Sequence, residues 1–160
     1  MPKAGSSAVD YHALAEFRYQ IRKFLTFSQE AARSAGIDPQ QHQLLLAIRG
    51  LPGHIKPSIR ALAERLQIRH HSAVELIDRS VAHGLVQRQR DGADRRQVKI
   101  HLTPKGESLL SELSIHHREE LRDAGRELAR VLRSILAAAK APLRHRQVPS
   151  SKDQGIRKTS

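Results

Sequence analysis

The sequence predicts a mainly α fold: a winged helix-turn-helix with a two-stranded β wing, and N- and C-terminal helices that form a dimerisation region. Several segments carry apolar residues at the three- and four-residue spacing of amphipathic helices. Residues 85–90 and 98–102 have the features of two short strands around a charged turn, and a long segment with an apolar stripe follows them. The 160 residues suffice for one domain with its own hydrophobic core.

The first helix is expected within residues 12–36, after a Pro-, Gly- and Ser-containing segment, 1–10, that we expect to be disordered. Gly36 ends this helix. Its apolar stripe, interrupted by Ser28, consists of Leu14, Phe17, Ile21, Phe24 and Leu25. A stripe of this kind needs a partner surface.

The second helix is expected to begin at Asp38. Asp38 is the N-cap, Pro39 occupies the first helical position, and Gln41 stands where the partner of a capping box belongs. Gly50 ends the helix.

Two further short helices follow. Ser58 is expected to cap a helix whose apolar stripe consists of Ile59, Leu62, Ala63 and Leu66. After a turn at residues 67–69, the next helix starts near His70 and ends at His83 and Gly84. We expect Val74, Ile77 and Val81 to form its apolar side.

The expected wing consists of strands 85–90 and 98–102. Alternation in the second strand predicts Val98, Ile100 and Leu102 inward and Lys99 and His101 outward. The first strand is polar on both faces, so only its beginning can pack on a core. Thr103 and Pro104 then start a helix that extends to about Ala139.

The formal net charge of +12 is concentrated in two places. Residues 54–106 carry 11 basic and 5 acidic residues, a net +6, and residues 140–160 carry 6 and 1, a net +5. This excess indicates an anionic partner, although a charge run alone often marks only a solvated face. We expect 141–160 to be a disordered basic tail, following one domain over 11–140.

Composition excludes several classes of protein. The absence of cysteine excludes disulfides, thiolate metal sites and thiol redox sensing, and the 3% of aromatic residues argues against a base-stacking single-strand binder. No phosphate loop, nucleophile motif or apolar carboxylate pair indicates an enzyme or a cofactor. The chain has no membrane-span-length apolar run and no signal-peptide core, so we expect a cytoplasmic protein.

The central block, 54–106, is the expected reading head, in which the helix after the turn enters the major groove of double-stranded DNA. Arginines near the hairpin tip suit a narrow minor groove. The candidate DNA-binding residues are Ser58, Arg69, His70, His71, Ser72, Glu75, Arg79, Arg90, Asp94, Arg95 and Arg96. A plain surface hairpin with solubilising charges is the alternative.

Several of these stretches together resemble the MarR family of bacterial transcriptional regulators. They are residues 59–66, 72–79 and 83–86, the wing stretch 91–96 (Asp-Gly-Ala-Asp-Arg-Arg), and 102–106 (Leu-Thr-Pro-Lys-Gly). The resemblance covers about residues 12–136 and implies an obligate homodimer with interlocking terminal helices, 12–36 and 104–139. It also implies a small-molecule signal sensed between the dimer region and the heads.

The resemblance assigns roles to individual positions. Asp94 matches the wing aspartate that forms an ion pair, and Arg95 and Arg96 match the wing's basic positions. Asp78 and Arg79 match a pair on the recognition helix for which the resemblance implies a mainly structural role, with a phosphate contact as the alternative. The chain departs from the family at His70 and His71, which affects base reading, and at Ser80, which predicts a looser helix contact.

The terminal helices point to a dimer without the resemblance. The apolar residues between Leu128 and Leu136 and the stripe of the first helix lack partner surface within one reading head, so we expect them to meet across a two-fold axis. Such a dimer would bind an inverted-repeat operator, most simply as a repressor. The alternative function is a non-specific architectural or RNA-binding basic module.

An effector is expected between the first, second and last helices. The candidate residues are Phe17, Ile21, Phe24, His42, Leu45 and Leu46, for whose apolar members core packing is the alternative role. The ten histidines include two adjacent pairs, and neighbours on a helix point about 100° apart. We therefore expect no metal site, although His42, His116, His117 and Glu120 could be brought together across a dimer.

Overall fold

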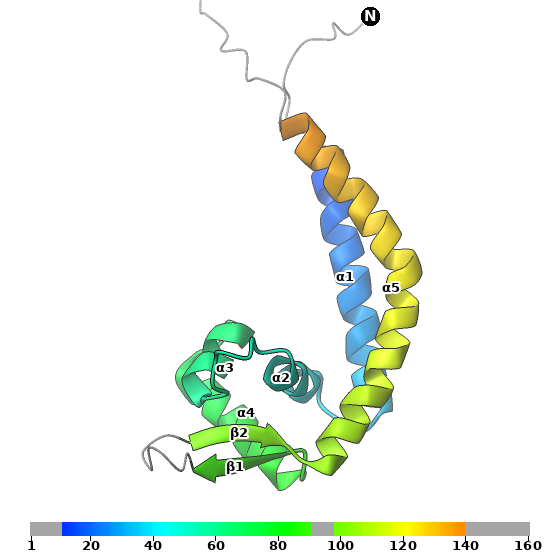
Figure 1. Cartoon of the computed structure of the whole chain (residues 1–160). Helices are drawn as coiled ribbons and strands as arrows, with labels where there is room; N and C mark the ends of the chain where they lie inside the picture. Colours follow the sequence, from blue (N-terminus) through cyan, green and yellow to red (C-terminus); the bar gives the residue numbers. More distant parts are fainter. Residues whose placement is uncertain (1–10, 91–97, 140–160) are drawn as a thin grey trace, which may run out of the picture.

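Two long helices form a pillar that rises from a smaller head (Figure 1). The computed structural model describes residues 11–90 and 98–139. The pillar consists of α1 (Tyr11–Ser34) and the length of α5 (Pro104–Ala139) that runs beside it. The head contains α2 (Pro39–Arg49), α3 (Ile59–Leu66), α4 (His70–Ala82), β1 (Val86–Arg90) and β2 (Val98–Leu102). The expected mainly helical fold with a two-stranded wing is confirmed.

Three segments lie outside the described residues. They are 1–10, 91–97 and 140–160. The disorder expected for the N-terminus and the basic tail therefore stays a prediction, and so do the roles of Asp94, Arg95 and Arg96. No helix in the described part of the chain is long and apolar enough to cross a membrane.

The expected helix starts are confirmed. Asp38 accepts a hydrogen bond from the Gln40 amide at 2.7 Å, and Gln41 Oε1 accepts one from the Asp38 amide at 3.1 Å, which completes a capping box at Pro39. Ser58 Oγ accepts a hydrogen bond from the Ala61 amide at 3.2 Å. These local bonds satisfy amides that the first helical turn leaves without partners.

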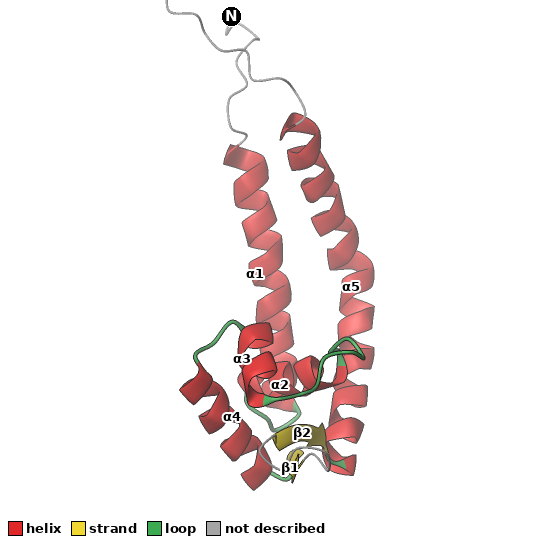
Figure 2. Cartoon of the chain, turned by 60° about the vertical axis from the view of Figure 1, so that its left-hand side comes forward, coloured by secondary structure: helices red, strands yellow, loops and turns green. Residues whose placement is uncertain are grey.

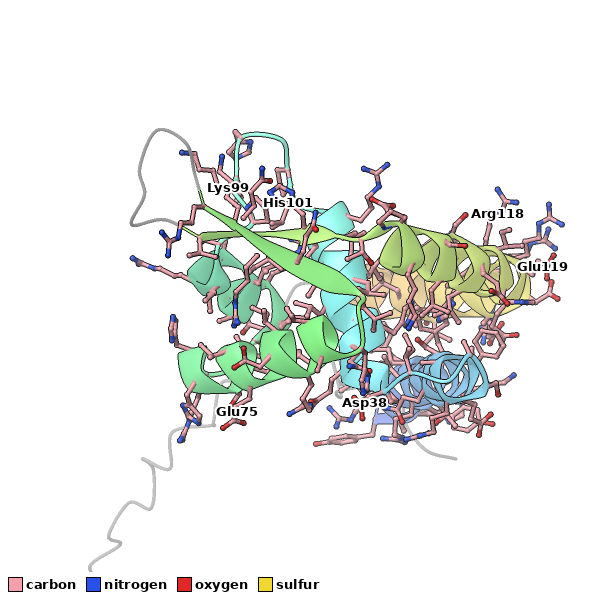
Figure 3. All side chains as sticks on the ribbon, turned by 90° about the horizontal axis from the view of Figure 1, so that it is seen from below. Asp38, Glu75, Lys99, His101, Arg118 and Glu119 are labelled. Carbon is pink, nitrogen blue, oxygen red and sulfur yellow. The ribbon has the colours of Figure 1, made fainter. Side chains whose placement is uncertain are left out.

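The wing is an antiparallel pair in which Val86 faces Leu102 and Arg90 faces Val98. As expected, only the first residue of β1 is buried. Val98, Ile100 and Leu102 pack in or against the core as expected, and Lys99 and His101 are half-buried. The reason is the α2–α3 connection, which covers β2: Ser58 forms a bridge with Lys99, and Pro57 accepts from the Ile100 amide at 2.9 Å (Figure 3).

The core lies inside the head and draws on each of its elements. Its largest fully buried apolar side chains are Leu44, Leu45, Leu62, Ile77, Leu85, Ile100, Leu113 and Val86. Leu113 belongs to α5, so the first turns of the long helix complete the head before the helix continues along α1.

The apolar side expected for α4 is wrong at Val81, which is 38% exposed. The buried face consists of Ala73, Leu76, Ile77 and Ser80, spaced three and four residues apart. The looser contact expected at Ser80 is also wrong. Ser80 is fully buried, and its hydroxyl donates to the Leu76 carbonyl at 2.8 Å, so the helix packs closely there.

The expected pairing of the terminal helices across a two-fold axis stays a prediction. In the pillar α1 and α5 run side by side within one chain (Figure 2), and Ala13 and Val131 are buried there. Part of each stripe is therefore covered without a second copy. Large apolar side chains on the same two helices stay exposed: Tyr11, Leu14, Tyr19, Leu25, Ile115, Leu121, Leu132 and Leu136.

Candidate nucleic-acid interface

The turn between α3 and α4 positions the candidate reading helix. Gln67 has a φ of 55°, the left-handed conformation, and its amide bonds to carbonyls of the last turn of α3. The Ile68 amide donates to the Ala63 carbonyl at 3.0 Å, and α4 begins at His70. Buried Leu62 on α3 and Ile77 on α4 then fix the two helices against the same core. The arrangement presents the opposite side of α4 to solvent.

The exposed side of α4, with its N-cap, carries five of the eleven expected DNA-binding residues. Arg69, His70, His71, Glu75 and Arg79 are exposed, and Glu75 points away from the head (Figure 3). Ser72 is half-buried. Arg69 is the N-cap without a side-chain capping bond, so its guanidinium is not used to stabilise the helix. A helix start with amide donors and a nearby cation suits a phosphate.

The remaining candidates are arranged beside this surface. Ser58 is half-buried, and its hydroxyl oxygen caps α3. Arg90 is exposed at the end of β1, where the described part of the wing stops. Arg79 Nη2 donates to Gln40 Oε1 at 3.4 Å, which ties the end of the α4 surface to α2.

Arg88, which sequence reasoning missed, links the wing to α4. Its Nη2 lies 2.6 Å from Asp78 Oδ1. The family resemblance implies a structural role for Asp78, but the sequence does not indicate that its partner is Arg88 on β1. Strand alternation could have suggested a role for Arg88, because it lies two residues from Arg90 and therefore on the same face of β1. The pair connects the wing directly to α4, in addition to the packing of both elements on the core.

Neutralising this ion pair should affect DNA binding more than stability. Both side chains are more than a third exposed, and pairs of this kind contribute about 0–1 kcal/mol. We expect Asp78→Asn to leave the unfolding free energy nearly unchanged but to weaken operator binding several-fold, because the wing loses its direct side-chain contact with α4. A double-mutant cycle with Arg88→Gln, measured by fluorescence anisotropy, checks this. Additive effects of the two substitutions would contradict the coupling.

The start of α5 is bonded to the end of α4. The Thr103 hydroxyl lies 2.6 Å from the Gly84 carbonyl, to which it donates, and accepts from the Gly106 amide at 3.1 Å. Lys105 Nζ donates to the His83 carbonyl at 2.9 Å. A side chain at Gly106 would overlap the Leu85 carbonyl oxygen. Each polar residue of the 102–106 motif therefore joins the pillar to the reading head.

The expected effector residues lie in different environments, and their role stays a prediction. Leu45 is buried in the core, Leu46 is 47% exposed, and Phe17, Ile21 and Phe24 are half-buried on α1. A groove of about 320 Å³ lies instead between α1, α2 and the α3–α4 turn. It is lined by Leu25, Ser28, Gln29, Pro39, Gln40, Gln43, Arg65, Leu66, Ile68 and Leu76.

His42, the polar member of the expected effector set, is buried beside His117. The two ring centroids are 4.8 Å apart. Burial, and secondarily the charge of His117, lower the pKa of His42 to about 4. Within residues 11–90 and 98–139, no three histidine, aspartate or glutamate side chains gather in a way that could bind a metal ion.

A helix-turn-helix whose second helix has a polar outer side and is followed by a β-hairpin defines a winged helix-turn-helix fold. Residues 35–97, which begin just after α1 and stop just before β2, match the family model described as MarR family. Over these residues the chain is similar to the MarR family.

Two curated proteins are similar in sequence. The uncharacterized HTH-type transcriptional regulator YsmB of Bacillus subtilis is 39% identical over 66 residues, covering 41% of this chain and 45% of that protein. A putative transcriptional regulatory protein for the hcr operon of Thauera aromatica is 29% identical over 96 residues, or 60% and 56% of the two chains. The chain thus spans about half the length of the curated relatives it matches.

Solved structures share the fold over most of their length. The transcriptional repressor CouR, bound to a 23-mer DNA duplex, is 26% identical with a TM-score of 0.59, covering 76% of this chain and 87% of that one. AbsC, a MarR family transcriptional regulator from Streptomyces coelicolor, is 18% identical with a TM-score of 0.66, covering 86% and 94%. At this identity AbsC supports the fold alone.

Proposed function

We propose that this protein is a sequence-specific DNA-binding transcriptional regulator that acts as a homodimer on an inverted-repeat operator, as a repressor. The exposed side of α4, with Arg69, His70 and His71 at its start, carries the proposal, because it combines phosphate-binding cations with groups suited to base edges. The description of CouR as a repressor bound to a DNA duplex supports the same mode of action. Such a function places the protein in the cytoplasm.

The proposal of a dimer rests on the apolar residues that the pillar leaves exposed. Leu121, Leu132 and Leu136 on α5 and Tyr19 on α1 are each at least 40% exposed. Large apolar side chains that recur exposed along both pillar helices are the kind of surface that a protein interface would cover. A closed two-fold pairing of pillars would bring two heads to successive half-sites about one helical turn apart.

Selection of bound duplexes from a random DNA pool tests the function directly. We expect a pseudo-palindromic sequence whose half-site spacing matches a two-fold dimer, bound at least about 10³-fold more tightly than random DNA. Sedimentation equilibrium at micromolar concentration should give the dimer mass. If no sequence were enriched and the affinity depended only on the salt concentration, the alternative of a non-specific architectural module would be favoured.

We also propose that the groove between α1, α2 and the α3–α4 turn accepts a small-molecule effector. Its floor includes Leu66, Ile68 and Leu76, and Arg65 is the only ionisable side chain among its lining residues in the described chain. This combination suits a small amphipathic anion. A ligand there would contact the pillar and the reading helices together, and would act only by preferring one of their arrangements.

An anion bound in this groove should depend on Arg65. We expect a panel of monocarboxylates, starting with benzoate, to contain members that release the selected operator from the wild type, with Arg65→Gln at least tenfold less sensitive. Arg60→Gln is the matched control, because Arg60 is exposed on the same helix and does not line the groove. Equal sensitivity of Arg65→Gln and the wild type would contradict this site.

A further inference from the structure

A cluster of rings joins the head to the pillar at His42. The His42 side chain on α2 is 3% exposed, and its ring lies 4.8 Å from that of His117 on α5, at an interplanar angle of 41°. Phe24 and Phe27 of α1 contact the His117 ring edge-on, with centroids 6.1 Å and 5.6 Å away. The three helices that connect head and pillar therefore meet at one pair of imidazoles.

His117 has a defined hydrogen-bonding role in this cluster. Its Nδ1 lies 2.6 Å from the Leu113 carbonyl and its Nε2 lies 2.7 Å from Ser28 Oγ. Because a carbonyl only accepts, Nδ1 carries the proton, and in the neutral ring Nε2 accepts from the Ser28 hydroxyl. His117 is thus held between α5 and α1 and presents its ring to His42.

His42 has no comparable support. Its Nδ1 is buried and has no hydrogen-bond partner among the described residues. A buried polar nitrogen without a partner already costs free energy, and a proton on the ring would add a charge to the same apolar setting. Protonation would therefore be opposed by burial and by any charge on His117.

The charged groups around this cluster do not compensate a proton on His42. α1 contributes Phe24, Phe27 and Ser28 to the cluster, none of which is a carboxylate. Charged and titratable residues of α1 and α5 line surface hollows beside Phe27: Arg22, Lys23, Glu30, Glu112, His116 and Glu120. Those around α2 bond elsewhere: Asp38 with the Gln40 amide, Arg49 with Glu107, Arg79 with Gln40, and His83 with Gln41. In the described chain, no carboxylate forms an ion pair with His42 or His117.

We propose that His42 and His117 form an acid-operated joint, in which protonation of His42 separates α2 from the pillar and lowers the affinity of the head for DNA. The separation follows because a charged His42 is accommodated only where water can reach it. Its consequence for DNA rests on the function proposed above, since the joint sets the position of the head relative to the pillar.

The direction of the pH effect follows from the lowered pKa of His42. Its folded-state pKa is about 4, against 6.5 for an ordinary histidine. The contact is therefore fully stabilising above about pH 6.5 and loses that contribution as the pH falls toward about 4. Between pH 7.5 and pH 5.0 these two values correspond to an increase of about thirtyfold in the equilibrium for opening the joint.

Amide hydrogen exchange of α2 in the full chain tests the joint without DNA. After correction for the intrinsic effect of pH, we expect exchange in the wild type to quicken by about thirtyfold between pH 7.5 and pH 5.0. His42→Phe keeps an aromatic ring that cannot be protonated and should show little change. His116→Phe, at an exposed neighbouring histidine, should behave as the wild type.

Two further measurements complete the test. The His42 ring signal in an NMR titration of the wild type should move near pH 4, and a midpoint near 6.5 would overturn the proposal whether or not His42→Phe folds. Operator affinity should fall at least tenfold more in the wild type than in His42→Phe over the same pH range. Equal falls would overturn the joint, whereas absence of any operator binding at pH 7.5 would instead contradict the proposed function and leave the exchange result to decide.

Discussion

Gly106→Ala is expected to destabilise the protein by about 3 kcal/mol or more, the largest effect of any substitution proposed for the fold. A Cβ atom at Gly106 would overlap the carbonyl oxygen of Leu85, and also its carbonyl carbon at 3.1 Å. Both atoms belong to the backbone of a fully buried residue that precedes β1, so neither can move away as a flexible side chain would. Overpacking of this kind costs 1–3 kcal/mol in a core, roughly, and more where backbone must shift.

The displacement would also break the bonds that join α5 to the head. The Gly106 amide donates to Thr103 Oγ1, and the same hydroxyl bonds the end of α4. Moving α5 away from Leu85 therefore costs a helix cap, about 1 kcal/mol, besides the overlap. Urea unfolding followed by circular dichroism, at one fixed protein concentration, measures the loss.

Gly125→Ala is the matched control in the same helix. A Cβ atom there would meet only side-chain carbons of Leu121, at 4.0 Å, which is an ordinary contact. Because alanine favours a helix over glycine by roughly 1 kcal/mol, this variant should be as stable as the wild type or slightly more stable. If Gly106→Ala were as stable as Gly125→Ala, the close approach of α5 to Leu85 would be refuted.

The contrast between local and distant contacts explains what the sequence could predict. The cap residues Asp38, Gln41 and Ser58 bond to amides within three residues, so their residue types and spacing were sufficient. The five helices and both strands were found for the same reason, since periodicity is a local property. Val81 shows the limit of such local reasoning. The inner face of α4 was predicted from three apolar residues that include Val81, whereas the buried position in the structure is the neighbouring Ser80.

The contacts that build the candidate sites join residues far apart in the chain. Ser28 and His117 are 89 positions apart, and nothing in either neighbourhood indicates the other. Predicting the ion pair between Arg88 and Asp78 would require knowing the angle between β1 and α4, and that angle depends on how both elements pack on the core. The pairing of α1 with α5 inside one chain was missed because apolar stripes show that a partner exists but not which chain supplies it.

Removing two cations from the proposed DNA-binding surface is expected to lower operator affinity about a hundredfold while the fold is kept. The double variant Arg69→Gln with Arg90→Gln takes one charge from the start of α4 and one from the end of β1. Both side chains are exposed. Each phosphate contact is worth about 1–1.5 kcal/mol, so two together give about two orders of magnitude.

The salt dependence distinguishes phosphate contacts from a change in structure. Each neutralised phosphate contributes about 0.9 to the slope of log affinity against log salt concentration. The double variant should therefore reduce that slope by about two, uniformly across operator sequences, which fluorescence anisotropy over a salt series will show. Base preference in the selected pool should be retained, because it depends on the helix surface that these substitutions leave in place.

The double variant Arg118→Gln with Arg133→Gln supplies the matched control. It removes the same net charge from exposed positions on α5 in the pillar, away from the reading head. Long-range attraction would fall equally in both double variants, whereas direct contact would be lost only in the first. Equal affinities and equal salt slopes for the two would show that Arg69 and Arg90 do not touch DNA, and the proposed orientation of α4 and the wing would have to be abandoned.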